Sequence, residues 1–342
     1  MTHETHITEN VRVSELKKLV TPEKLKEALP AGDELTQKVL SDRQTVRDII
    51  HLKDDRLLLV IGPCSIHDPK AALDYATRLA KLAEQVKDRY FIVMRVYFEK
   101  PRTTIGWKGF INDPHLDDSC DMEHGLHAAR KLMVDIAKLG LPIATEFLDP
   151  IVPQYTADLV SWSAIGARTT ESQTHREMAS GLSMPVGFKN ATDGNIMVAI
   201  NAIESASIPH SFLGIDQDGH TAVVTTTGNP NTHLVLRGGG KQPNFEVPEV
   251  TYAACKLEAA GLEPSLMVDC SHANANKVAR NQVKVWEDIL KQREKGHSPI
   301  TGAMVESFIE EGNQKISADM TYGQSITDQC IDWETTEKML LG

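Results

Sequence analysis

Eight short apolar runs alternate with helix-like segments along this 342-residue chain. The run 57–61 contains only leucine, valine and isoleucine, as expected of a strand that is covered on both faces. Asp68 and Pro69 then provide an N-cap and a first-turn proline for a helix. The other strand-like runs lie at 91–96, 142–147, 164–166, 186–188, 234–236, 266–268 and 303–305. This alternation predicts the α/β class, with parallel strands joined by helices in a (β/α)8 TIM barrel.

Two segments do not fit a minimal barrel. Residues 1–50 contain an expected extended stretch at 10–13 and a helix-like stretch at 21–28. Residues 210–227 contain two β-rich runs about a turn, which predicts an inserted β-hairpin. We expect residues 1–50 to form an N-terminal extension for assembly or regulation, and residues 51–342 to form a catalytic barrel that includes a regulatory hairpin. Additions to a barrel are also found as inert decoration, so the role of both segments stays open at this point.

Composition limits the possible partners. A formal charge of −11 at pH 7 argues against nucleic acid, because binding a phosphate backbone requires a basic surface. No run of about 18 apolar residues occurs, so we expect no membrane partner. The five cysteines are odd in number and widely spaced, which fits a reducing cytoplasm better than a disulfide framework. We therefore expect a cytoplasmic protein in which any cationic cluster is local.

Four residues at or after the ends of predicted strands could hold a metal ion. A thiol, an imidazole and two carboxylates suit Mn, Fe, Co or Zn in a partly open site, unlike the closed sets of structural zinc. The four are Cys64, His272, Glu306 and Asp328. They lie far apart in the sequence, and each has a plainer interpretation. Cys64 can equally be a small buried residue, and His272 a hydrogen-bonded loop histidine.

A second set of strand ends carries positive charge. Guanidinium groups bind phosphate or carboxylate with two parallel hydrogen bonds, whereas lysine acts as a point charge. The set is Arg95, Lys100, Arg102, Arg168, Lys189 and Arg237. Any one of these is also consistent with a solvated residue or a surface ion pair, but six around one mouth predict a multiply anionic substrate set. Lys189 could alternatively form a Schiff base.

The motifs around these residues are long enough to identify a family. They are 62–68 (GPCSIHD), 95–104 (RVYFEKPRTT), 166–173 (GARTTESQ), 187–190 (GFKN), 236–239 (LRGG), 269–272 (DCSH), 306–307 (ES) and 325–328 (SITD). The chain resembles the type I, microbial class of 3-deoxy-D-arabino-heptulosonate 7-phosphate (DAHP) synthases nearly end to end. That resemblance implies a metal-dependent transferase that joins phosphoenolpyruvate to erythrose 4-phosphate in the first step of the shikimate pathway.

The resemblance also implies a role for each candidate residue. It makes the four candidate ligands hold one divalent metal ion. It places Arg168 and Arg237 at the phosphate of phosphoenolpyruvate, with Arg95 and Lys189 at its carboxylate. Arg102 and Thr103 would hold the phosphate of erythrose 4-phosphate, Lys100 would lie between the substrates, and Glu146 would position a water molecule. The residues counted as catalytic are Lys100, Glu146, Lys189 and His272.

Feedback regulation is a further implication of the resemblance. Regulated relatives bind an aromatic amino acid beside the barrel, in a cavity built from the hairpin, neighbouring loops and the N-terminal segment of a partner subunit. The matching positions here are Asp149, Gln154, Ser183, Phe212 and Gly214, with Val11 and Val13 from the N-terminal segment. Glycine at 214 is typical of tyrosine-sensitive members, and serine of phenylalanine-sensitive ones. We therefore expect tyrosine to inhibit a homodimer or homotetramer.

Three departures from the family pattern concern loops and the C-terminus. Ala191 stands where a glycine is usual, the run 238–240 has one more glycine than is common, and the sequence ends at Gly342, short of the end of a typical C-terminal helix. None removes a proposed catalytic group.

Two competing functions also remain: a Schiff-base aldolase that uses Lys189, and a barrel that senses sugar phosphates without turnover. The sequence names neither the metal nor the choice between dimer and tetramer.

Overall fold

The computed structural model describes residues 8, 10–296 and 298–342. Eight parallel strands close into a barrel in the order β1-β10-β9-β8-β5-β4-β3-β2. The strands are β1 (Leu57–Gly62), β2 (Tyr90–Arg95), β3 (Ile143–Glu146), β4 (Trp162–Ile165), β5 (Val186–Lys189), β8 (Thr232–Leu236), β9 (Leu266–Asp269) and β10 (Ile300–Glu306). Each of the eight expected runs overlaps one of these strands, so the predicted TIM barrel is confirmed.

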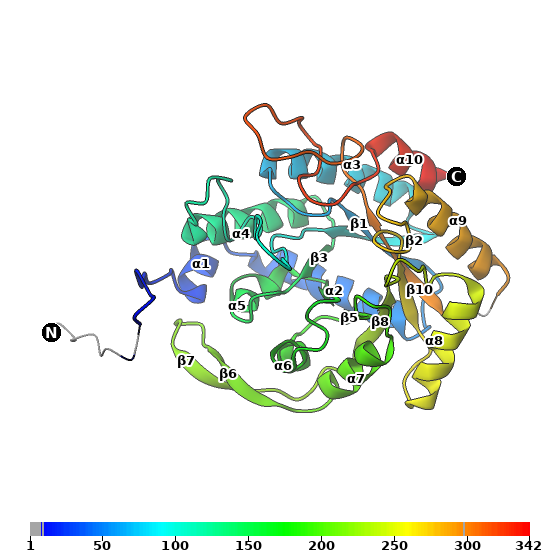
Figure 1. The fold of residues 1–342 in the computed structure, drawn as a ribbon, viewed down its shortest axis with the longest axis horizontal. Helices are drawn as coiled ribbons and strands as arrows, with labels where there is room; N and C mark the ends of the chain where they lie inside the picture. Colours follow the sequence, from blue (N-terminus) through cyan, green and yellow to red (C-terminus); the bar gives the residue numbers. More distant parts are fainter. Residues whose placement is uncertain (1–7, 9, 297) are drawn as a thin grey trace.

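Helices surround the barrel on its outside (Figure 1). They are α3 (Pro69–Val86), α4 (Met122–Lys138), α5 (Val152–Thr156) with the 3-10 turn η1 (Ala157–Leu159), α6 (Gln173–Gly181), α7 (Met197–Ala206), α8 (Val247–Ala259), α9 (Asn281–Glu294) and α10 (Trp333–Leu341). The predicted start of α3 is confirmed, because Oδ1 of Asp68 accepts the backbone N–H groups of Lys70 at 2.8 Å and Ala71 at 3.2 Å. Within the described residues, no helix combines the length and apolarity needed to cross a membrane.

The barrel has two apolar layers because side chains alternate between the faces of each strand. One layer lies between strands and helices and includes Leu57, Leu59 and Ile61 of β1. The other fills the barrel interior and includes Leu58 and Val60 of the same strand. Every second residue therefore points inward. A polar residue that follows the interior positions at the C-terminal end of a strand must then face the barrel mouth.

The floor of the barrel is closed by a helix that the sequence analysis did not predict. Helix α2 (Gly32–Ile50) packs against the barrel, and its Val46, Ile49 and Ile50 join the interior layer. Glycine at its first position and the many polar residues of its outer face weaken the helical pattern in the sequence. The expected helix at 21–28 is confirmed as α1 (Pro22–Ala28), which Thr21 caps.

The predicted hairpin is confirmed as β6 (Ser211–Ile215) and β7 (Thr221–Thr225), paired antiparallel. Its ribbon runs outside α6 and α7 as an outer layer (Figure 1). The expected extended stretch at 10–13 is wrong for this chain, which has a turn there: the N–H of Val13 donates to the carbonyl of Asn10 at 3.0 Å. Asn10 has a left-handed φ of 54°, which asparagine tolerates and which reverses the chain. Residues 1–7 and 9 of the expected extension lie outside the described residues.

Candidate active site

The ends of six strands bring charged side chains to the barrel mouth. Each lies two residues beyond an interior residue of its strand and so shares its inward direction. The clearest cases are Arg95 after Val93, and Glu306 after Met304. The full set is Arg95, Glu146, Lys189, Arg237, Asp269 and Glu306. The alternation that fills the barrel with apolar side chains therefore also assembles a charged site at its C-terminal end.

Three of the four expected metal ligands lie together. The ligand atoms of Cys64, Glu306 and Asp328 lie within 4.8 Å of one another. Burial, followed by the negative charge of Glu306, raises the pKa of the Cys64 thiol to about 11. Two carboxylates and a thiol that favours its neutral form are a donor set that a divalent cation would stabilise, because the cation would offset their mutual repulsion. The residues therefore fit a metal ion.

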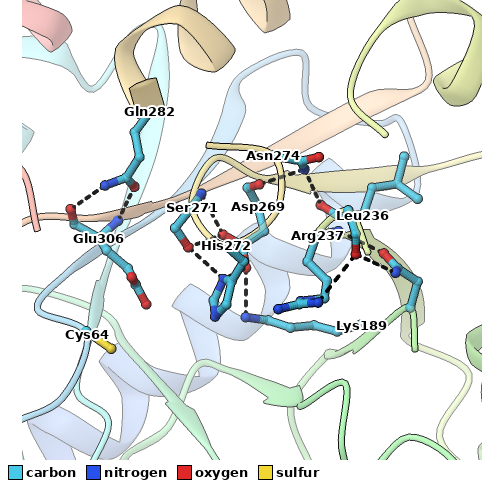
Figure 2. Close-up of polar contacts among 12 residues, drawn as sticks. Cys64, Lys189, Leu236, Arg237, Asp269, Ser271, His272, Asn274, Gln282 and Glu306 are labelled. Carbon is cyan, nitrogen blue, oxygen red and sulfur yellow. Dashed lines mark hydrogen bonds and ion pairs between the residues drawn. The ribbon is translucent and has the colours of Figure 1, made fainter. Parts of the chain in front are cut away.

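His272, the fourth expected ligand, lines the same cavity as Asp328 but is held by other groups in this structure. Its Nδ1 lies 2.9 Å from Oδ2 of Asp269 and 2.7 Å from Oγ of Ser271. Figure 2 shows these contacts beside the carboxylate of Glu306. His272 has a left-handed φ of 53°, which is uncommon for a residue other than glycine and occurs where a site fixes the backbone. With Nδ1 engaged, Nε2 is the atom that could bind a metal.

The expected cations surround one polar cavity of about 120 Å³. Five of the six line it directly: Lys100, Arg102, Arg168, Lys189 and Arg237. Thr103 belongs to the same mouth, because its Oγ1 accepts a hydrogen bond from Nε of Arg168 at 3.2 Å. His272 and Asp328 line the same cavity as these cations. This arrangement suits a multiply anionic ligand set beside a metal site.

Arg95, the sixth cation, contacts one of the candidate metal ligands. Its Nη2 lies 3.1 Å from Oε1 of Glu306, and both side chains are buried. Within the described chain, its Nη1 is buried without a hydrogen-bond partner. A buried guanidinium with an open donor is costly unless a ligand completes its bonding, so Nη1 suits an incoming carboxylate.

Lys100 lies against the proposed metal ligands. Its Nζ is 3.0 Å from the carbonyl oxygen and 3.1 Å from Sγ of Cys64. Burial would lower the pKa of Lys100, but the neighbouring Cys64, Glu306 and Glu146 outweigh burial and raise that pKa. The ammonium form of Lys100 is therefore favoured beside the candidate metal ligands.

Glu146 reaches the cavity because the neighbouring strand leaves room for it. A Cβ atom on Gly166 would lie 2.2 Å from Oε1 of Glu146, so a larger residue at 166 would displace the carboxylate. Glu146 itself is buried at the end of β3 and lines the cavity with Lys189. Its position is compatible with the expected contact to a water molecule.

The residues expected at an effector site are spread over the hairpin side of the molecule. Gln154 of α5 accepts a hydrogen bond from Nε2 of Gln217 at 2.6 Å, which ties the hairpin turn to α5. Phe212 and Gly214 lie on β6, whereas Ser183 is exposed in the loop between α6 and β5. Asp149 donates its backbone N–H to Glu99 at 3.0 Å. Val11 and Val13 are exposed, with 68% and 47% of their surface accessible.

Three residues of the site were given no role from the sequence. Asp269 contacts both Lys189 and His272, Gln282 bonds the backbone of Glu306, and Lys277 lines the cavity beside Asp328. The signal for Asp269 was present, because an aspartate at the end of an apolar strand is a buried charge that needs partners. Gln282 and Lys277 carry no comparable signal, since such residues are common on helices and loops.

Taken together, a (β/α)8 barrel with cations and possible metal ligands around one mouth defines an enzyme that acts on phosphorylated, anionic substrates. The comparisons with known proteins agree. Residues 20–341 match the DAHP synthetase I family. The chain therefore belongs to that family, and it is an enzyme of aromatic biosynthesis by the shikimate pathway.

The relatives resemble the chain over nearly its whole length. It is 55% identical to the Tyr-sensitive phospho-2-dehydro-3-deoxyheptonate aldolase of Escherichia coli (strain K12), over 97% of this chain and 94% of the relative. It is 54% identical to the Phe-sensitive enzyme of the same strain, over 97% and 95%. A solved aldolase of this name from Francisella tularensis SCHU S4 superposes with a TM-score of 0.94 at 49% identity and covers 96% of both chains.

Proposed function

We propose that the chain condenses phosphoenolpyruvate with D-erythrose 4-phosphate and water to give DAHP and phosphate, with the help of one divalent metal ion. The observation that carries the proposal is one cavity lined by six lysine and arginine side chains and by two of the candidate metal ligands. Fixed cations of this kind can offset the several negative charges that the two substrates bring together.

The phosphoenolpyruvate half of the site would use the residues on β2, β5 and the loops after β4 and β8. Arg168 and Arg237 line the cavity and would bind the phosphate, which matches a guanidinium fork. Arg95 and Lys189 are buried beneath them and would meet the carboxylate. This order would place C3 of phosphoenolpyruvate toward the open side of the cavity, where the second substrate enters.

The erythrose 4-phosphate half would use the loop after β2. Arg102 lines the cavity, and Thr103 lies within hydrogen-bond distance of Arg168. Both would hold the second phosphate, and Lys100 would lie between the substrates. The aldehyde carbon would then face C3 of phosphoenolpyruvate and form the new carbon–carbon bond. Holding the two in this order removes much of the entropic cost of the reaction.

The metal would be held by Cys64, His272, Glu306 and Asp328, and it would supply Lewis-acid polarisation of the aldehyde oxygen. Mn, Fe, Co and Zn all suit these ligands. As C3 attacks, positive charge develops at C2. A water molecule positioned by Glu146 would add there, after which phosphate leaves. Glu146 would accept a proton from the water, and the former aldehyde oxygen, left as an alkoxide when its π bond opens, would take up a proton.

The Schiff-base alternative is disfavoured by the surroundings of Lys189. Its Nζ lies 2.8 Å from Oδ2 of Asp269, and both groups are buried. A Schiff base requires an unengaged amine as nucleophile, whereas this Nζ is occupied by its contact with a buried carboxylate. A sensing barrel without turnover is disfavoured by the catalytic residues present at every expected position.

Omitting the substrates one at a time tests the proposal. Phosphate release should require both phosphoenolpyruvate and erythrose 4-phosphate, and borohydride added during turnover should trap no protein adduct. Phosphate release with phosphoenolpyruvate alone, or a borohydride adduct at Lys189, would show another reaction. Lack of release with both substrates and each of the four metals would support the sensor instead.

We infer further that tyrosine inhibits the enzyme at the hairpin side of the molecule. The relatives do not decide the effector, since the identities to the Tyr-sensitive and Phe-sensitive enzymes are 55% and 54%. Gly214 supports tyrosine, because the absence of a side chain leaves room for a phenol hydroxyl. A Cβ at this position would lie 2.8 Å from Cγ2 of Val224, so a serine would narrow this face of the hairpin.

The division of the chain is also a proposal. Residues 1–50 would serve assembly and regulation, and residues 51–342 would form the catalytic barrel with the regulatory hairpin 210–227. The exposed Val11 and Val13 could then reach the hairpin side of a partner in a homodimer or homotetramer. We propose a cytoplasmic location, in keeping with the reduced cysteines and the pathway.

A further inference from the structure

We propose that Asp269 is a positioning residue that fixes His272 and Lys189 relative to one another, and thereby couples metal binding to phosphoenolpyruvate binding. This inference rests on the proposed function, because it takes His272 as a metal ligand and Lys189 as a substrate contact. It adds a residue that touches neither substrate nor metal but holds one group of each kind.

The two carboxylate oxygens of Asp269 contact different groups. Its Oδ1 accepts the backbone N–H of Ser271 at 3.0 Å and the hydroxyl of Ser271 at 2.6 Å. Its Oδ2 faces both Nζ of Lys189 at 2.8 Å and Nδ1 of His272 at 2.9 Å. One oxygen therefore anchors the side chain, while the other is shared by two groups from opposite halves of the site (Figure 2).

Burial makes this arrangement rigid. Asp269 has no accessible surface, and Lys189 is 4% exposed. A buried charge without partners is strongly destabilising, so the carboxylate cannot leave its partners at little cost. The backbone is held as well: Nδ2 of Asn274 donates to the carbonyl of Asp269 at 2.9 Å and to that of Leu236 at 3.2 Å. The end of β9 is thus fixed to the end of β8, beside Arg237.

The contact with His272 determines which nitrogen can bind a metal. With Nδ1–H directed at Asp269 and Ser271, the lone pair of Nε2 is left for the ligand. A carboxylate behind a ligating histidine orients the ring and increases its basicity, and removing such a partner usually weakens metal affinity about 10- to 100-fold. The same oxygen holds Lys189, so its loss should also weaken the binding of the substrate carboxylate.

The test uses Asp269→Asn, which keeps the size of the side chain and removes its charge. Metal affinity is measured on the metal-stripped protein by competition with a chromogenic chelator, using Mn and Zn separately. The dissociation constant of phosphoenolpyruvate is measured by calorimetry without the second substrate. We expect metal affinity to fall about 10- to 100-fold, and phosphoenolpyruvate affinity to fall at least about tenfold. If both affinities stay within about twofold of the wild type, or only one falls, the inference is overturned.

Asp158→Asn is the matched control. Asp158 of η1 pairs with the buried Arg130 at 2.7 Å, and neither residue lines the cavity of the site. Its loss removes the charged partner of a buried cation outside the site and should leave both affinities unchanged. If Asp158→Asn loses as much metal and phosphoenolpyruvate affinity as Asp269→Asn does, general loosening of the fold explains both results and the inference is overturned.

If Asp269→Asn does not fold, a second variant tests whether Asp269 couples the two binding sites. In Lys189→Gln the carboxylate oxygen that Lys189 shared is left to Nδ1 of His272, so it should hold the imidazole more strongly and tighten metal binding severalfold. Unchanged or weaker metal affinity would contradict the coupling. Wild-type protein serves to separate the two proposals: absence of metal binding and of phosphate release there would refute the proposed function itself.

Discussion

The guanidinium of Arg95 lies 3.1 Å from Oε1 of Glu306, and the two side chains are 1% and 2% exposed. One residue is a proposed substrate contact and the other a proposed metal ligand. In a dry environment the pair is held together by charge, and each partner would be costly to leave alone. The positive group therefore stabilises the ligand cluster when no metal is bound.

Arg95→Leu should destabilise the metal-free protein by about 3 to 5 kcal/mol, because it leaves Glu306 buried without its partner. Added metal should recover more stability in the variant than in the wild type, since the cation would replace the missing positive charge. Guanidinium unfolding of both proteins, with and without Mn, measures this. An equal metal effect on both would contradict the placement of Glu306 among the ligands.

The two phosphate sites can be separated by kinetics. Arg102→Ala should raise KM for erythrose 4-phosphate by about 10- to 100-fold, since each charge-assisted contact contributes about 1.5 to 3 kcal/mol. Arg237→Ala should instead raise KM for phosphoenolpyruvate. Steady-state kinetics with each substrate varied in turn gives both constants. Equal changes in the two constants, for either variant, would refute the assignment of that arginine.

Effector choice should depend on Gly214. In Gly214→Ser, inhibition by tyrosine should weaken about tenfold or more, because a hydroxyl without room costs about 1 to 3 kcal/mol. Inhibition by phenylalanine should strengthen. Ala259→Ser, an exposed position on α8, is the control and should change neither. Titrating activity with tyrosine, phenylalanine and tryptophan decides it, and a wild-type enzyme insensitive to millimolar tyrosine would remove the basis of the prediction.

Acid stability should depend on His233 inside the barrel. Nε1 of Trp162 donates to Nε2 of His233 at 2.9 Å, and burial lowers the pKa of His233 to about 4. The neutral ring therefore stabilises the fold fully above the unfolded pKa of about 6.5, and this contribution is lost as pH falls toward 4.

The lost contribution amounts to about 2 to 3 kcal/mol between pH 7 and pH 4.5. His233→Gln should show a correspondingly smaller drop in unfolding free energy over that range, measured by denaturant titration at both pH values. His220→Gln, at the exposed hairpin turn, should behave as the wild type does. Parallel pH dependence in wild type and His233→Gln would show that His233 is not held neutral.

The barrel could be predicted because its signal is local. Continuous apolar runs such as 57–61 are typical of strands that are covered on both faces. The alternation of side chains along such strands also directs Arg95 and Glu306 to the mouth. Helix α2 was missed because its sequence is largely polar and the three residues that join the interior layer depend on the barrel floor, which only the closed fold creates. The turn at 10–13 likewise depends on one left-handed residue.

The site was predictable in its members but not in their connections. Long motifs identified Cys64, His272, Glu306 and Asp328, and the structure groups three of these directly. The shared oxygen of Asp269 could not be foreseen, because it requires the ends of β5 and β9, which β8 separates, to lie at a known distance. The contact between Lys189 and Asp269, which are 80 residues apart, depends on the register of the strands. That register cannot be read from the sequence.

We propose that a metal-dependent condensation takes place at the mouth of this barrel. The most direct test is phosphate release from phosphoenolpyruvate and erythrose 4-phosphate by metal-stripped protein, before and after adding Mn, Fe, Co or Zn singly. We predict no release without metal, recovery with at least one of the four, and no recovery in Cys64→Ala, which should retain its fold. Full turnover by the stripped protein, or near-normal activity and metal content in Cys64→Ala, would contradict the account.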